Sequence, residues 1–138
     1  MLDYSLWGKI ALCIFCGTIV GIERQKHKKP IDVRTSVLIC LGTMIFIYLA
    51  NHMDGEKDST RVLGQVVSGI GFLGAGAIIN RQGLVVGLTS ASVVWVLAAI
   101  GAAIGLGQHA IGVTVSLITL AILMGSHWFE NRMGRNGA

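Results

Sequence analysis

The sequence predicts an all-α membrane protein, a polytopic bundle of about five transmembrane helices. Of its 138 residues, 53% are hydrophobic and only 13% are charged, whereas soluble domains have about 25% charged residues. Five apolar segments approach the length of about 20 residues that a membrane-spanning helix needs. Because the chain has a single proline and so little room for a flexible linker, we expect residues 1–138 to form one transmembrane domain.

The five apolar segments are joined by short polar connections. The first segment has no Ala-x-Ala cleavage pattern after it, so we expect it to be a retained span rather than a secretory signal. The three cysteines all lie within apolar segments, and we interpret them as small packing residues. The spans are predicted at about residues 4–22, 33–50, 62–79, 89–106 and 110–128.

The positive charges between the spans predict an orientation. In a five-span arrangement, eight cations fall on one side of the membrane and three on the other. Because cytoplasmic loops carry the excess of Lys and Arg, we expect the N-terminus outside and the C-terminus in the cytoplasm. This clustering beside spans also argues against nucleic acid as the partner of a chain with net charge +4. The richer side holds Arg24, Lys26, Lys28, Lys29, Arg34, Arg81, Arg132 and Arg135, and the other side holds Lys9, Lys57 and Arg61.

Charged residues are concentrated where the first span ends and the second begins. Glu23 and Arg24 close the first span, and Asp32, Arg34 and Thr35 open the second. Asp32 can cap the second helix by accepting amide protons of its first turn. We also expect Glu23 to pair with Arg34. Two interpretations remain open: these residues tie two helices together at the membrane boundary, or they form a small charged site for an ion or a partner protein.

Glycines are unusually frequent in the third span. Gly69 and Gly76 share one helix face, and Gly71 and Gly74 lie on the other. Small residues let membrane helices approach closely, so the spacing predicts a central helix with neighbours on both sides. The alternative is a locally broken helix whose free carbonyl groups line a cation path.

Other polar or aromatic residues stand out in the third and fourth spans. Gln65 and Ser68 are three residues apart and could bond a neighbouring span or face a polar cavity. Trp95 lies deep in the fourth span, where we expect it to pack against other helices.

At the start of the fourth span, a glycine that favours a turn is followed by residues with hydroxyl side chains. Gly87 precedes Thr89, Ser90 and Ser92, which could cap the helix. No Gly-x-Ser-x-Gly nucleophile elbow is present, and the histidines fall at predicted span ends or loops, so we expect no enzymatic activity. The sequence assigns neither a cofactor nor a set of metal ligands.

Several blocks together resemble the MgtC/SapB family of bacterial inner-membrane proteins. They run in order through nearly the whole chain, and the third and fourth are specific in combination. The blocks are Gly21 to Gln25, Arg34-Thr35 leading to Gly42, Gly69 to Ala77, and Gly87-Leu88-Thr89 through Trp95 to Gly101.

The resemblance implies a multi-pass protein of the bacterial plasma membrane that modulates other membrane machinery. The family is associated with adaptation to low magnesium and with survival inside host cells. Better-known members carry a soluble cytoplasmic domain after the last span, so we expect only the transmembrane part here, and Ile31-Asp32-Val33 departs from the small-residue pattern of many members. Our leading hypothesis is a non-enzymatic modulator that forms at least a dimer. The alternative is a small Mg²⁺ transporter or channel that acts as an oligomer.

Overall fold

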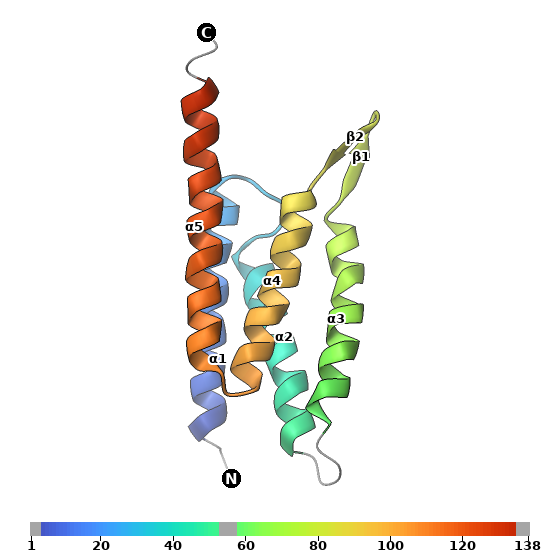
Figure 1. Ribbon diagram of the computed structural model, residues 1–138, viewed down its shortest axis with the longest axis vertical. Helices are drawn as coiled ribbons and strands as arrows, with labels where there is room; N and C mark the ends of the chain where they lie inside the picture. The colour runs from blue at the N-terminus through green and yellow to red at the C-terminus, as the bar shows by residue number, and fades with distance from the viewer. Residues whose placement is uncertain (1–3, 53–57, 135–138) are drawn as a thin grey trace.

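The computed structural model describes residues 4–52 and 58–134, which form an elongated bundle of antiparallel helices (Figure 1). Lys57 and Arg135, which the charge count above includes, lie outside these residues. The first helix begins and the last helix ends at opposite ends of the bundle (Figure 1). The helices are α1 (Tyr4–Lys26), α2 (Val33–His52), α3 (Ser59–Gly76), α4 (Leu88–Gly105) and α5 (His109–Gly134).

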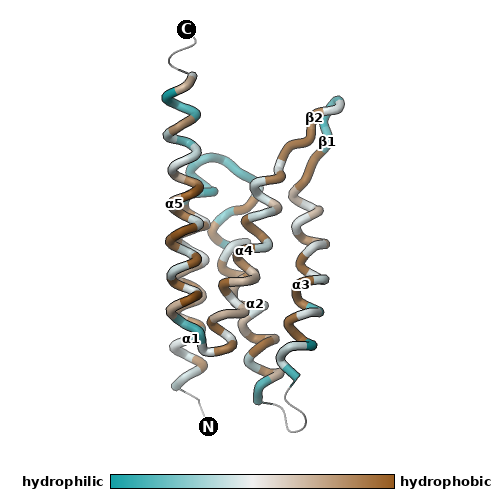
Figure 2. The backbone as a smooth tube through the Cα atoms, in the orientation of Figure 1, coloured by the Kyte–Doolittle hydropathy of each residue, from teal (hydrophilic) through white to brown (hydrophobic). Residues whose placement is uncertain are grey.

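The helical class is confirmed, and four of the helices, α1, α2, α4 and α5, are long and apolar enough to cross a membrane. Helix α3 is not among them. Its 18 residues include the polar first turn Ser59-Thr60-Arg61, together with Gln65 and Ser68. Apolar residues line the helices, and hydrophilic residues collect mainly at their ends and connections (Figure 2).

A short β-hairpin, which was not predicted from the sequence, follows α3. Strands β1 (Ile79–Arg81) and β2 (Leu84–Val86) pair antiparallel and are exposed along their whole length. The two turn residues, Gln82 and Gly83, have φ values of 51° and 83°. Positive φ at both positions is what the tight two-residue turns of hairpins require.

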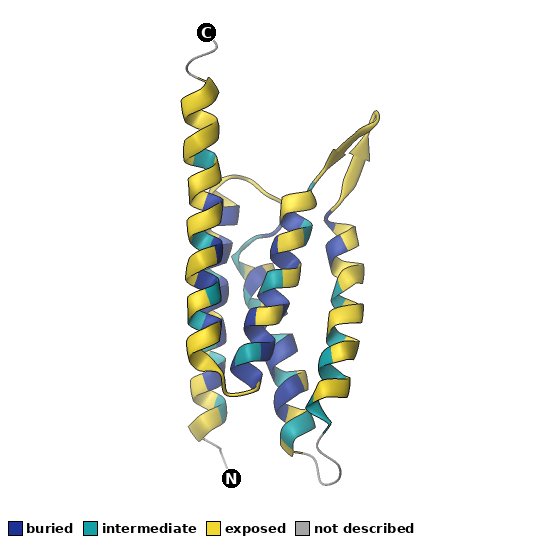
Figure 3. Cartoon of the chain, viewed as in Figure 1, coloured by how far each residue is buried: buried dark blue, intermediate teal, exposed yellow. Residues whose placement is uncertain are grey.

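Helix α4, not α3, is the central element of the bundle. It packs against each of the other helices, whereas α3 contacts mainly α2 and α4. The α4 side chains Leu97, Ile100 and Ile104 are fully buried, as are Cys40 and Met44 of α2. In Figure 3 the buried residues concentrate on α4 and on the faces that surround it, while α3 is largely exposed.

Within one chain, the predicted packing role is therefore wrong for Gly69, Gly71 and Gly76. A Cβ atom built on Gly69, Gly71 or Gly76 would meet nothing within 4 Å. Gly74 alone of this group faces a neighbour, because its Cβ would lie 3.6 Å from the carbonyl oxygen of Ala91 on α4. The physical reason is position: α3 lies at the edge of the bundle, so most of its surface has no helix against it.

Close backbone approach occurs instead at glycines of α1 and α4. A Cβ on Gly21 of α1 would lie 2.6 Å from the Cα of Val33, at the start of α2. A Cβ on Gly101 of α4 would collide with the carbonyl oxygen of Cys40 in α2. These two glycines let α2 lie against both α1 and α4, as small residues do in membrane bundles.

Candidate functional site

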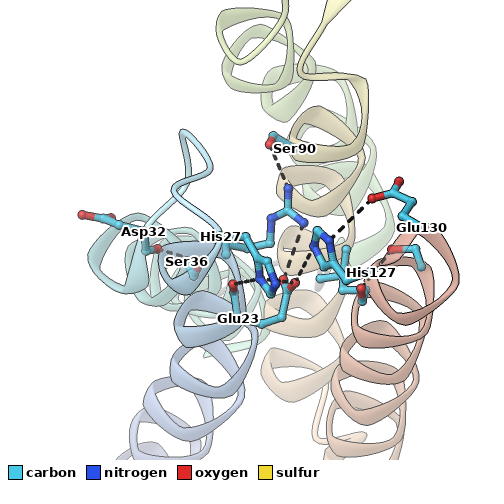
Figure 4. A network of polar contacts seen from close by, with 10 residues as sticks. Glu23, His27, Asp32, Ser36, Ser90, His127 and Glu130 are labelled. Atoms are coloured by element: carbon cyan, nitrogen blue, oxygen red, sulfur yellow. Dashed lines mark hydrogen bonds and ion pairs between the residues drawn. The ribbon is translucent and has the colours of Figure 1, made fainter. Parts of the chain in front are cut away.

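A cluster of buried charged residues lies where α1 ends, beside the start of α4 and the second half of α5 (Figure 4). Arg24 is only 1% exposed and Glu23 only 5%. The guanidinium of Arg24 donates a hydrogen bond from Nη2 to the hydroxyl of Ser90 on α4, at 3.2 Å. Its Nη1 lies 3.5 Å from Oε2 of Glu23. The packing of α1 against α4 thus encloses an ion pair and a polar contact between the two helices.

Two histidines complete the cluster on the other side of Glu23. His27 follows it by one helical turn, and its Nδ1 lies 3.1 Å from Oε1 of Glu23. His127 of α5 places Nε2 at 3.2 Å from the same oxygen. The two imidazole rings stack with centroids 3.7 Å apart and planes 5° from parallel. Nδ1 of His127 also faces Oε2 of Glu130, at 3.8 Å.

The cluster has charge partners but an incomplete set of hydrogen bonds. Within the described residues, both carboxylate oxygens of Glu23 and Nε of Arg24 lack a hydrogen-bond partner. A buried charge is costly unless it is paired and hydrogen-bonded. The opposite charge of Arg24 offsets part of this cost for Glu23. Oε1 of Glu23 therefore remains able to accept a proton donor or a cation.

Asp32 caps α2 as expected, but Arg34 does not pair with Glu23. Oδ1 of Asp32 accepts hydrogen bonds from the backbone N–H and the hydroxyl of Thr35, both at 2.8 Å. Arg34 bonds Oδ2 of Asp32 through Nε at 3.0 Å. The exposed Arg34 side chain thus has a partner two residues away. These bonds, the backbone one foremost, lower the pKa of Asp32 to about 2.

The hydroxyl cap predicted for α4 is not formed. Gly87 itself is the N-cap residue, with φ of 95°, and no side chain completes the cap. Thr89 is exposed, and Ser90 receives the Arg24 hydrogen bond instead. A Cβ on Gly87 would collide with the carbonyl oxygen of Ala77. The positive φ and this close approach are the structural reasons for glycine here.

Three further predicted residues lie away from the charge cluster. Gln65 and Ser68 are exposed on α3, and Gln65 lines the groove between α2 and α3. Trp95 does not pack in the core: it is 56% exposed and lines the groove between α3 and α4. The structure therefore separates the predicted residues into a charge cluster around α1 and a groove region beside α3.

Three residues of the cluster were not predicted from the sequence: His27, His127 and Glu130. The spacing of His27 four residues after Glu23, on one face of a helix end, was an available local signal. His127 was placed at a span end, but α5 continues to Gly134, so this histidine lies inside a helix. Because nothing local relates His127 to Glu23, their proximity depends on how α5 packs against α1.

The fold and the cluster define a polytopic helical membrane protein with a partly buried ionic site at one end of its bundle: Glu23 and Arg24 are buried, whereas the His27 side chain is 39% exposed. More narrowly, the chain belongs to the MgtC family, whose model matches residues 10–132. The sequence resemblance to this family is thereby confirmed.

Similar proteins come from several bacteria. The chain is 39% identical over 132 residues to the protein named "Putative magnesium transporter YhiD" of Escherichia coli K12, covering 90% of this chain and 61% of that protein. It is 37% identical over 117 residues to Protein MgtC of Brucella abortus, covering 83% and 49% respectively. Protein SrpB of Synechococcus elongatus is 31% identical over 131 residues, covering 85% and 72%. No solved structure matches the chain.

Proposed function

We propose that this protein is a non-enzymatic modulator in the bacterial inner membrane, acting in adaptation to low magnesium or to host-cell stress. It would act by packing α3 against another membrane protein or a second copy of itself. The observation that carries this proposal is the incomplete packing of α3. Phe72 is 83% exposed, and Gly71 and Gly76 have open space where a side chain would be.

Grooves flank α3 on both sides. The groove between α3 and α4 has a volume of about 300 Å³, and Val66, Ile70 and Trp95 are among its lining residues. The groove between α2 and α3, of about 370 Å³, includes Phe46 and Gly69. Since lipid tails are as apolar as these side chains, a helix that docks here gains from close packing rather than from the hydrophobic effect.

The proposed orientation keeps the N-terminus outside and the C-terminus in the cytoplasm. The α1–α2 connection, the hairpin and the end of α5 all lie at one end of the bundle (Figure 1). These segments, together with the last turn of α1 and the first turn of α2, hold seven of the eight cations counted on the richer side, Arg135 being outside the described residues. The positive-inside tendency supports a cytoplasmic position for this end.

The chain spans 61% of the length of YhiD and 49% of the length of the Brucella MgtC protein. For this reason the complete activity of a longer relative is not assigned to this chain.

Transport of Mg²⁺ is the alternative, and the name of the YhiD relative favours it. A hydrated dication needs oxygen ligands to replace its water. Among the described residues, Glu23 is the only buried carboxylate. The buried hydroxyls of Ser36, Ser116 and Thr119 bond backbone carbonyls near them in sequence. These features support the modulator over a continuous cation path.

A flux assay separates the two functions. Purified protein in liposomes that contain a Mg²⁺-sensitive dye should give no signal above empty liposomes. If liposomes with the wild-type protein give a dye signal above that of empty liposomes, and the Glu23→Gln variant does not, the protein is a transporter rather than a modulator.

Cross-linking tests the docking role of α3. Phe72→Cys, on the exposed face of α3, should form cross-linked products in native membranes. Ile122→Cys, on the exposed face of α5, is the matched control because its side chain is 66% exposed. The native cysteines are fully buried and should react little. The mass of the product distinguishes a homodimer from a complex with another protein, and equal yields at the two positions would contradict the proposal.

A further inference from the structure

Glu23, His27 and His127 bring three metal-ligating atoms together from the end of α1, the turn that follows it, and α5. One carboxylate oxygen and two imidazole nitrogens all lie within 4.8 Å of one another. In Figure 4 the two imidazole rings lie side by side next to the Glu23 carboxylate.

The state of Glu23 is an independent observation that points to a ligand. Its side chain is 4% exposed, and both of its oxygens lack a hydrogen-bond partner among the described residues. Nη1 of Arg24 lies 3.5 Å from Oε2. Oε1 is thus a buried anionic atom that faces two imidazole nitrogens, and a cation at this point would give it a strong partner.

We propose that Glu23, His27 and His127 bind one divalent transition-metal ion of the zinc class. Oε1 of Glu23 and Nε2 of His127 are two of the ligands. The third is a ring nitrogen of His27, whose Nδ1 lies 3.1 Å from Oε1 and also 2.9 Å from the backbone carbonyl oxygen of Glu23, a contact that Nδ1 would exchange for the metal if it is the ligand. A fourth position is left for water or another ligand. Three protein ligands with one open position are a common arrangement for zinc. This proposal does not depend on the modulator function.

The donor atoms set the selectivity of the site. Imidazole nitrogen suits Zn²⁺, Co²⁺ and Ni²⁺, whereas Mg²⁺ prefers an octahedron of oxygen atoms. With two nitrogens among three ligands, the site should discriminate against Mg²⁺. The ion bound at this position would therefore differ from the one in the name of the YhiD relative.

Neighbouring residues support the ligands. Glu130 places Oε2 at 3.8 Å from Nδ1 of His127, the nitrogen that does not ligate. This is an ion-pair distance, longer than a hydrogen bond; a carboxylate that closes onto this nitrogen orients a metal-bound imidazole and raises its basicity. Arg24 engages Oε2 of Glu23, which leaves Oε1 as a single donor atom. A bound ion would fasten the second half of α5 to the end of α1.

Metal titration of the purified full chain in nanodiscs, after treatment with a chelator, tests the proposal. Zn²⁺ should bind at one ion per chain in competition with a chromophoric zinc indicator. Co²⁺ should give the visible absorption bands of a site with nitrogen ligands. A large excess of Mg²⁺ should not displace either ion. Affinity should also fall at acidic pH, because the imidazoles must lose their protons to ligate.

Variants identify the ligands. His127→Ala and Glu23→Gln should each weaken Zn²⁺ binding by more than about 100-fold. Glu130→Gln should weaken it by no more than about 10-fold, the low end for groups that support a ligand, because this carboxylate is 75% exposed and lies 3.8 Å from His127. His109→Ala is the matched control: this histidine starts the same helix at the opposite end of the bundle (Figure 1), and its loss should leave affinity unchanged.

Some outcomes would overturn the site. If the wild-type chain binds neither Zn²⁺ nor Co²⁺, the proposed site is wrong, whatever the variants show. Equal affinity in wild type and His127→Ala, or displacement by Mg²⁺ at equal concentration, would also overturn it. Thermal unfolding of each variant shows whether it is folded. His127→Gln, which keeps a polar side chain of similar length, repeats the test if the alanine variant is unstable.

Discussion

Arg24 at the end of α1 and Ser90 in the first turn of α4 are joined by a hydrogen bond of 3.2 Å, with both side chains buried. This bond connects two of the sequence blocks that carry the family resemblance. It also fixes the position of the Arg24 guanidinium, whose other terminal nitrogen, Nη1, lies 3.5 Å from Oε2 of Glu23. The ionic cluster therefore depends on the contact between α1 and α4 as well as on α5.

Removal of either partner of this contact should destabilise the bundle, but to different extents. Ser90→Ala leaves one buried donor unmatched and should lower the free energy of unfolding by about 1–3 kcal/mol. Arg24→Ala leaves the Glu23 carboxylate without its charge partner and should cost about 3–5 kcal/mol. Reversible unfolding in mixed detergent micelles measures both. Arg132→Ala, which removes an arginine from the exposed end of α5, is the control; a loss as large as that of Arg24→Ala would contradict the assignment.

Glycine-to-alanine substitutions should separate contact glycines from exposed ones. Gly101→Ala places a methyl group against the Cys40 carbonyl and should cost about 1–3 kcal/mol through overpacking. Gly71→Ala places the same group in open space and should be neutral or stabilising, because alanine favours helix by about 1 kcal/mol. Thermal unfolding of the two variants in detergent makes the comparison. If Gly71→Ala is the more damaging change in the isolated chain, α3 does not lie at the edge of the bundle.

Two glycines with positive φ should respond differently to alanine. Both Gly87 and Gly83 have left-handed backbones, with φ of 95° and 83°, and the conformation alone costs a non-glycine residue about 1–2 kcal/mol. Only at Gly87 would the new Cβ also collide with a backbone oxygen, that of Ala77. Gly87→Ala should therefore lower the unfolding temperature more than Gly83→Ala does. Equal shifts would mean that the chain between α3 and α4 is not held close to the start of α4.

Acidification should remove the contribution of the Asp32 cap. The pKa of Asp32 is lowered from 3.8 to about 2 by the Thr35 backbone N–H first, then by the Thr35 hydroxyl and Arg34. A depressed pKa in the folded state gives stability that is complete above the unfolded value and is lost as pH falls through the folded value. The stability difference between wild type and Asp32→Asn should thus shrink between about pH 4 and pH 2. Unfolding curves across this range measure it, and a constant difference would argue against the cap.

Local features of the sequence predicted the elements well. Apolar length placed all five helices, and α4 begins and ends within one residue of its predicted bounds. Asp32 was predicted as a cap because a carboxylate just before an apolar run can accept the amide protons of the first turn. The hairpin was missed because its two strands are only three residues each, too short for a periodic pattern.

The candidate site was predicted only in part, and the errors share one cause. Glu23 and Arg24 were identified because ionisable groups inside apolar segments are rare. Arg34 was paired with the wrong carboxylate, since the sequence does not show that Asp32 is the nearer partner. His127 was not connected with Glu23 at all. A contact between helices that are far apart in the chain leaves no local pattern.

Composition and the lengths of the apolar segments by themselves determined that this protein is helical and belongs in a membrane, because every backbone group in lipid must find its hydrogen bond within a helix or a closed barrel. Tertiary structure alone decided that α4 is the centre, that Gly21 and Gly101 rather than the α3 glycines are the contact points, and that His127 lies beside Glu23. The physical reason is that hydrogen bonding within a helix depends on neighbours in sequence. The choice of a neighbouring helix depends on shape and charge complementarity between surfaces that the chain brings together only when it packs.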